Sequence, residues 1–305
     1  MTAIIQTEKL TKSYGPHRGI IDVDLEVNQG EVFGFLGPNG AGKTTTIRTL
    51  LDLIRPTSGR ASIFGLDAAA DSVSIHRRLG YLPGEFGLYD KLTGGETIEY
   101  FANLRGGIDP AYVRALVDRL DLDPSRTFRE YSKGNKQKVG LVVALQHQPE
   151  LLILDEPTSG LDPLIQQTFF DLVRDARREG RTVFLSSHII SEVDRTCDRV
   201  AIIREGRIVR SGTLDALRDL SHHAVTLRFS GEVPAAAQAA FAALPGVSEI
   251  VADDHVLRMR VTGPIGPVVR EAGRYELLDF ERQEPSLEET FLAAYGREAV
   301  DVRAH

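Results

Sequence analysis

One short stretch, GPNGAGKT at residues 37–44, constrains the fold of this chain more than any other. It matches the pattern G-x-x-x-x-G-K-[ST], whose glycines let the backbone curl so that its N–H groups point at phosphate oxygens. A short apolar run at residues 31–36 precedes it, and we expect a helix over residues 43–54 that Pro56 and Gly59 end. A phosphate loop between a strand and a helix indicates an α/β fold.

Two side chains of this loop have a defined chemistry. Lys43 can reach the β- and γ-phosphates of a nucleotide, and the Thr44 hydroxyl can bind Mg²⁺. The helix that begins at Lys43 adds the positive end of its dipole. The alternative, a chance glycine-rich turn, does not account for the flanking strand and helix. The predicted nucleotide-binding residues here are Gly37, Pro38, Asn39, Gly40, Ala41, Gly42, Lys43, Thr44 and Thr45.

A pair of acids follows a second apolar run. Residues 151–154 are LLIL, and Asp155 and Glu156 come directly after them. Ligands of open α/β sheets bind at the carboxyl ends of the strands, which is where this pair is expected. Asp155 can hold Mg²⁺, and Glu156 can orient and deprotonate a water that attacks a phosphoryl group. The alternative is a solvated strand end without function.

Strands and helices alternate through the first part of the chain. Residues 20–27 alternate between apolar and polar, whereas 151–154 and 182–185 are continuous apolar runs typical of strands buried on both faces. Helical periodicity over residues 163–179 separates the last two. This order predicts a mostly parallel sheet with helices packed on it.

The pattern changes after residue 220, where 13 acidic residues stand against 8 basic ones. This order favours a small α+β domain of the ferredoxin-like type, followed by a helix that Ser286 caps. The predicted domains are therefore residues 1–220 and 221–305. The expected order is strand, helix, strand, strand, helix, strand, at residues 224–230, 235–244, 247–251, 255–261, 264–273 and 275–281.

Composition excludes several classes of protein. The net charge of −7 argues against a general nucleic-acid binder, which needs a basic face. No stretch approaches the roughly 18 apolar residues of a membrane span. The first residues lack the basic start and apolar core of a signal peptide. Cys197 is the single cysteine, which fits a reducing compartment, so we expect a cytoplasmic location.

Five motifs in order resemble the ATP-binding-cassette (ABC) ATPase family over about the first 220 residues. They are SYG at 13–15, GPNGAGKTT at 37–45, YSKGNKQKV at 131–139, LLILDEPTSGLDP at 151–163 and SSH at 186–188. The resemblance implies a P-loop NTPase cassette with a mostly parallel sheet, antiparallel N-terminal strands and a helical signature subdomain. It implies ATP and Mg²⁺ as ligands.

The resemblance also implies roles for single residues. Tyr14 would stack on adenine, and His188 would sense the γ-phosphate. Ser132 and Gly134 fit the signature motif, which in this family covers the nucleotide of a second subunit. The loop 159–162 matches the one that touches that subunit. Simpler alternatives are a turn aromatic for Tyr14, a surface histidine for His188 and a helix cap for Ser132.

One position departs from the family pattern. The family usually has a glutamine that binds Mg²⁺ after an aromatic–x–Pro step, but here Tyr81, Leu82 and Pro83 are followed by Gly84 and Glu85. Glu85 or a water could substitute, and the sequence leaves both open.

The signature variant and the tail PSLEETFL at 285–292 resemble ATPase subunits of drug- and antibiotic-resistance exporters. That resemblance implies export of a drug, antibiotic or lipid-like cargo through a separate membrane permease. It further implies a second ATPase subunit, identical or not, no nucleic acid, and a place on the inner face of the cell membrane. The alternative is the ABC ATPase of a non-transport assembly or regulatory complex.

Overall fold

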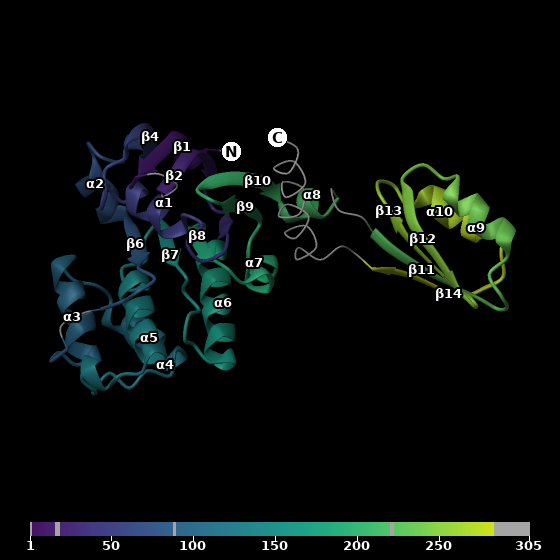
Figure 1. Ribbon diagram of the computed structural model, residues 1–305. Coiled ribbons are helices and arrows are strands. Elements are labelled where there is room, and N and C mark those ends of the chain that lie inside the picture. Colours follow the sequence, from purple (N-terminus) through teal and green to yellow (C-terminus); the bar gives the residue numbers. More distant parts are fainter. Residues whose placement is uncertain (1, 16–18, 88–89, 220–222, 284–305) are drawn as a thin grey trace. The chain divides into compact units, whose positions relative to one another are not determined.

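The structure, a computed structural model, divides into two compact units, Met1–Ser211 and Gly212–His305, which are described here one at a time (Figure 1). The predicted domains 1–220 and 221–305 stay a prediction. The predicted helix after Ser286 lies outside the described residues, as does the 285–292 tail. Described are residues 2–15, 19–87, 90–219 and 223–283.

The first unit is built on a six-stranded sheet with the order β10-β9-β3-β8-β7-β6. Strand β3 pairs in parallel with β8 and β9, and β7 pairs in parallel with β6 and β8. Every residue of β3, β7 and β8 is buried, which explains their mostly apolar sequences. The strands are β10 (Arg207–Thr213), β9 (Arg199–Arg204), β3 (Val32–Leu36), β8 (Thr182–Ser187), β7 (Leu151–Asp155) and β6 (Leu79–Leu82).

The register of these strands brings three loops to one edge of the sheet. Leu36 of β3 lies beside Ser187 of β8, and Asp155 of β7 lies beside Ser186. Parallel strands end on the same edge, so the glycine-rich loop, the acid pair and His188 are neighbours in space.

A second sheet of this unit is antiparallel, with the order β2-β1-β4-β5. Burial alternates along β2, as its sequence pattern predicts. Ile5 and Val23 from this sheet share one hydrophobic core with Phe35 of β3 and Ile47 of helix α1. The bounds are β1 (Ala3–Ser13), β2 (Gly19–Asn28), β4 (Ser58–Ile63), β5 (Leu66–Asp67) and α1 (Lys43–Leu50).

The remaining helices of the first unit complete the predicted cassette. Helices α3, α4 and α5 gather away from the antiparallel sheet, so the predicted helical subdomain and the mostly parallel α/β class are confirmed (Figure 1). The bounds are α2 (Ser72–Arg78), α3 (Gly94–Leu104), α4 (Pro110–Arg119), the 3₁₀ helix η1 (Phe128–Glu130), α5 (Lys133–Leu145), α6 (Pro163–Arg178) and α7 (Ile190–Thr196).

Helix α1 is shorter than its sequence predicts. It ends at Leu50 rather than at residue 54. Asp52 adopts a left-handed φ of +54°, a conformation that no regular right-handed helix contains. The N–H groups of Leu53 and Ile54 then both bond Arg48 O, which closes the helix. The expected end at residue 54 was therefore wrong by one turn.

The second unit contains an antiparallel sheet with the order β12-β13-β11-β14. Helices α9 and α10 cover one face of it (Figure 1), and Leu227, Phe241 and Val268 are part of its own core. The order strand, helix, strand, strand, helix, strand is that of a ferredoxin-like domain, so the predicted α+β class is confirmed. The bounds are α8 (Leu214–Asp219), β11 (His223–Phe229), α9 (Ala235–Ala242), β12 (Val247–Asp253), β13 (Val256–Val261), α10 (Gly266–Ala272) and β14 (Leu277–Gln283).

Across the ranges that the structure describes, no helix combines the length and the apolar character needed to cross a membrane.

Candidate functional site

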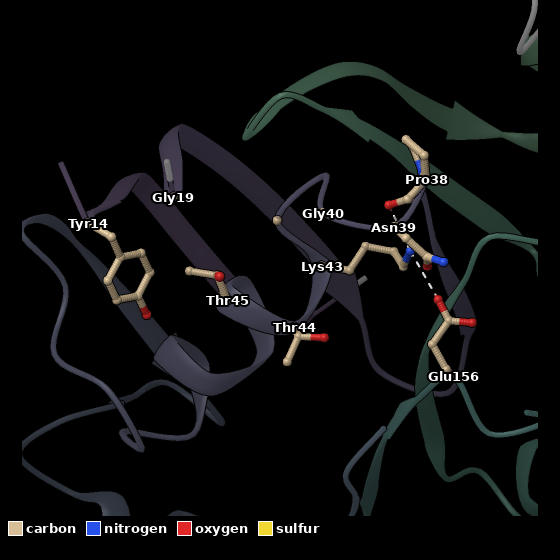
Figure 2. Close-up of a pocket in the computed structure, with 10 residues that line it drawn as sticks. Tyr14, Gly19, Pro38, Asn39, Gly40, Lys43, Thr44, Thr45 and Glu156 are labelled. Carbon is tan, nitrogen blue, oxygen red and sulfur yellow. Dashed lines mark hydrogen bonds and ion pairs between the residues drawn. The ribbon is translucent and has the colours of Figure 1, made fainter. Parts of the chain in front are cut away.

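A cleft of about 500 Å³ lies at the carboxyl end of β3 (Figure 2). Most of the predicted nucleotide-binding residues line it. Gly19 lines it too, although nothing in the sequence pattern indicates that residue. The lining residues are Tyr14, Gly19, Pro38, Asn39, Gly40, Gly42, Lys43, Thr44, Thr45 and Glu156.

The curl of the loop depends on glycine at two positions. Gly40 and Gly42 have φ values of +81° and +112°, which residues with a Cβ rarely adopt. A Cβ on Gly42 would also lie 2.7 Å from a methyl carbon of Ile20. Helix α1 starts directly after Gly42, so its free N–H groups and positive dipole end face the cleft. This geometry suits a polyphosphate.

Two predicted residues of the loop do not line the cleft. The Gly37 N–H is bonded to Ser187 O at 3.2 Å. The Ala41 side chain is buried in the hydrophobic core, and its N–H bonds Pro38 O at 3.2 Å. Their contact with a nucleotide stays a prediction.

Lys43 is fixed in the cleft by three partners. Its ammonium donates to Gly37 O at 2.5 Å and to Pro38 O at 3.2 Å. It also forms an ion pair with Glu156 Oε1 at 3.0 Å (Figure 2). An ammonium has three N–H donors, so these contacts fix its direction. The positive charge is therefore held beside both the loop and the acid pair.

Asp155 is fully buried and is held by hydroxyl groups. Thr44 donates to Asp155 Oδ2 at 2.7 Å, and Ser186 donates to Asp155 Oδ1 at 2.5 Å. Burial, together with the negative charge of Asp155, raises the pKa of Tyr81 to about 12, so that phenol stays neutral. A carboxylate and a hydroxyl oxygen are ligand types that Mg²⁺ takes, so Thr44 and Asp155 fit this ion.

Glu156 stands in a strained backbone conformation between two basic groups. Its φ of +50° is left-handed, which costs about 1–2 kcal/mol for a residue with a Cβ. One carboxylate oxygen faces Lys43, and the other lies 2.7 Å from His188 Nδ1. The Glu156 N–H donates to the carbonyl and the hydroxyl of Ser186, at 3.2 and 3.1 Å. The structure thus joins Lys43 at the start of α1, Glu156 after β7 and His188 after β8.

Sequence reasoning missed Ser186 as part of the site. Its hydroxyl donates to Asp155 and accepts from the Glu156 N–H, so one side chain links both acids. The signal was available, because Ser186 comes directly after the apolar run at residues 182–185, in a strand that pairs in parallel with the strand ending in Asp155. What the sequence lacks is the register between the two strands.

Tyr14 lines the cleft, and 54% of its surface is exposed. This exposure suits a ring that stacks on a base, which stays a prediction.

Gly84 lies beside the acid pair, since a Cβ there would be 3.3 Å from Asp155 Oδ2. Glu85 is exposed and does not line the cleft. The backbone of Gly84 therefore lies next to the Asp155 carboxylate, and its correspondence to the family's glutamine stays a prediction.

The structure does not bring Ser132 and Gly134 to the cleft of their own chain. Ser132 caps helix α5 by accepting from the Asn135 N–H at 3.2 Å. Gly134 packs so closely on Gly160 that a Cβ would lie 2.4 Å from the Gly160 carbonyl oxygen. Their role toward a nucleotide stays a prediction.

Residues 20–159 match the protein family described as ABC transporter. The bacitracin transport ATP-binding protein BcrA of Bacillus licheniformis is 40% identical over 221 residues, which cover 72% of each chain. The daunorubicin resistance ATP-binding protein DrrA3 of Streptomyces coeruleorubidus is 35% identical over an alignment of 306 residues, which covers 96% of each chain.

Solved structures have the same fold. The ATP-binding subunit of an ABC transporter is 34% identical with a TM-score of 0.65, covering 70% of this chain and 92% of that one. A dimeric ATP-binding cassette in a post-hydrolysis state, bound to ADP and Pi, has a TM-score of 0.62 over 69% of this chain and 98% of that one. It is 22% identical, so this second likeness shows the fold alone.

Proposed function

This chain belongs to the ABC transporter family of ATP-binding proteins, and from that premise we propose that it is the ATP-hydrolysing subunit of an exporter whose permease is a separate chain. Relatives that match over most of their length are named for bacitracin transport and daunorubicin resistance, which supports a drug or antibiotic as cargo. These names do not favour the alternative of a non-transport assembly ATPase.

The observation that carries the proposal is the meeting of five side chains at one edge of the sheet. Lys43 and Thr44 begin helix α1, directly after the loop that follows β3. Asp155 and Glu156 come from the end of β7, and His188 comes from the end of β8. The three segments that carry these residues lie far apart in the sequence, so chance does not explain why they meet at one place in the structure. Phosphoryl transfer needs this combination of positive charge, metal ligands and base.

Each group has a task in ATP hydrolysis. The N–H groups of the loop and Lys43 bind the polyphosphate, and Tyr14 stacks on the adenine. Thr44 and Asp155 hold Mg²⁺, which when bound neutralises charge on the phosphates. Glu156 accepts a proton from the attacking water. His188, hydrogen-bonded to Glu156, orients that carboxylate and contacts the γ-phosphate.

We further propose that two cassettes act together. Ser132, Gly134 and the loop 159–162 would face the nucleotide of a second subunit, so ATP favours the closed pair. The pair would lie on the cytoplasmic face of the membrane against its permease. Residues 221–305 would form an accessory domain without a catalytic role.

Affinity purification from membranes solubilised in mild detergent tests the transport role. We expect a multi-span membrane protein to co-purify with the full chain, and ATP hydrolysis of that complex to respond to added drug. Recovery of nucleic acid or ribosomes in place of a membrane protein would contradict the transport role. A preparation without any Mg²⁺-dependent ATP affinity would contradict the ATPase itself.

A further inference from the structure

The first two turns of helix α5 contact the loop that carries Glu156. Lys133 donates to Ser159 Oγ at 2.7 Å, and Gly134 packs on the Gly160 carbonyl. Gln137, one turn further on, reaches the backbone of Glu156 itself. Three contacts from one helix therefore hold a single short loop.

Gln137 makes the most specific of these contacts. Only 2% of its surface is exposed. Its amide nitrogen donates to Glu156 O at 3.2 Å and to Pro157 O at 3.1 Å. A side-chain amide has two N–H donors, and Gln137 uses both of them on two consecutive carbonyls. These two bonds fix the orientation of the amide and hold the backbone of Glu156 and Pro157. The Glu156 carbonyl also accepts from the Ser159 N–H at 3.1 Å.

This contact acts at the strained residue of the site. Glu156 has a left-handed φ of +50°, a conformation that persists only where neighbours hold it. Ser186 holds the N–H of Glu156, and Gln137 holds its carbonyl. The peptide groups on both sides of the Glu156 Cα are thus fixed, and with them the direction of its carboxylate toward Lys43 and His188.

We propose that Gln137 is a positioning residue for Glu156. It keeps the backbone of Glu156 in the left-handed conformation from which the carboxylate can act as base. The proposal rests on the proposed function, in which Glu156 is that base. It adds that helix α5, whose first turn carries the signature residues, also sets the geometry of the base in its own subunit.

The test is Gln137→Met, which keeps the length of the side chain and removes both donors. We expect kcat for ATP hydrolysis by the purified full chain to fall by about 10- to 100-fold, because small displacements of a catalytic group have effects of this size. The Kd for ATP measured without hydrolysis should stay within about twofold, since Gln137 does not line the cleft. Glu156→Gln in combination with Gln137→Met should be no slower than Glu156→Gln alone.

Gln146→Met is the matched control. Gln146 follows the last residue of the same helix and is equally buried at 2%, but it lies far along the helix from the Glu156 loop. It should keep the kcat of the unmodified protein. If Gln137→Met is poorly folded, Gln137→Glu replaces it, since a carboxylate cannot donate to the two carbonyls.

The possible failures are distinguishable. An unchanged kcat in Gln137→Met, with Glu156→Gln inactive, overturns this inference and leaves the proposed function intact. Loss of ATP affinity in step with kcat, or misfolding of both Gln137 variants while Gln146→Met folds, shows a structural role and also overturns it. Normal hydrolysis by Glu156→Gln removes the base assignment itself.

Discussion

At the residue scale, the site works through a small number of buried polar contacts that orient charged groups. Ser186 links Asp155 to the backbone of Glu156, and Lys43 uses all three donors on the loop and on Glu156. Buried polar groups of this kind keep their hydrogen-bond partners, because each unmade hydrogen bond costs about 1–3 kcal/mol. The carboxylate of Glu156 therefore has a direction before any ligand binds.

Replacement of the proposed base tests this arrangement most directly. Glu156→Gln keeps the shape of the side chain but cannot accept a proton, so we expect kcat for ATP to fall by about 100-fold or more. ATP binding and ATP-dependent dimerisation should remain, as measured by equilibrium binding and light scattering. Glu150→Gln is the control, since Glu150 forms an exposed pair with Arg78 away from the cleft. Normal hydrolysis by Glu156→Gln would rule out Glu156 as the base.

At the element scale, strand register and helix ends decide which side chains meet. Strands β7 and β8 place Asp155 beside Ser186, and helix α5 carries the signature residues at its start. Just beyond the end of α5, His147 bonds β6 through its Nε2, which donates to Leu79 O at 3.0 Å. The His147 Nδ1 atom is buried and has no hydrogen-bond partner among the described residues. Burial, and secondarily the charge of Arg105, lowers the pKa of His147 to about 4.

This histidine should make stability depend on pH. The unfolded chain binds a proton near pH 6.5 and the folded chain only near pH 4, so the unfolded state is favoured as the pH falls through that window. Because the ring is partly exposed, we expect a loss of about 1–2 kcal/mol between pH 7 and pH 4.5. Urea unfolding at both pH values measures it. His147→Gln should lose less stability over the same window, and an equal loss in both proteins would contradict the assignment.

At the scale of the whole molecule, the chain has two units with separate cores. The first core joins both sheets of the cassette around α1, and the second lies between the antiparallel sheet and helices α9 and α10. The residues that line the cleft all belong to the first unit. We therefore expect nucleotide binding to need no side chain of the second unit.

Truncation tests this independence. A fragment of residues 1–219 should fold, because its core is complete, and should bind ATP with a Kd within about threefold of that of the full chain. Calorimetry of the full chain should resolve two transitions, of which only one shifts upward with ATP and Mg²⁺. An insoluble fragment, or one cooperative transition for the whole chain, would show that the two units depend on each other for folding.

The sequence by itself determined the chemistry and the fold class. Three patterns carried this information, and each depends only on residues that are close together in the sequence. They are the loop at residues 37–44, the acids Asp155 and Glu156, and the alternation of apolar runs with helical periodicity. They were sufficient for the mostly parallel α/β class of the first unit and for the order of strands and helices in the second. The cassette, with its antiparallel strands and its helical subdomain, was implied by the resemblance to the ABC family.

Only the tertiary structure decided which distant groups touch. The bond of Ser186 to Asp155, the hold of Gln137 on the Glu156 carbonyl and the close approach of Gly84 to Asp155 join residues 19 to 71 positions apart. The early end of α1 at Leu50 belongs here too, since it depends on a left-handed Asp52 that helix propensity does not reveal. The physical reason is that strand register and backbone strain result from the packing of the whole core, and no short stretch of sequence contains that information.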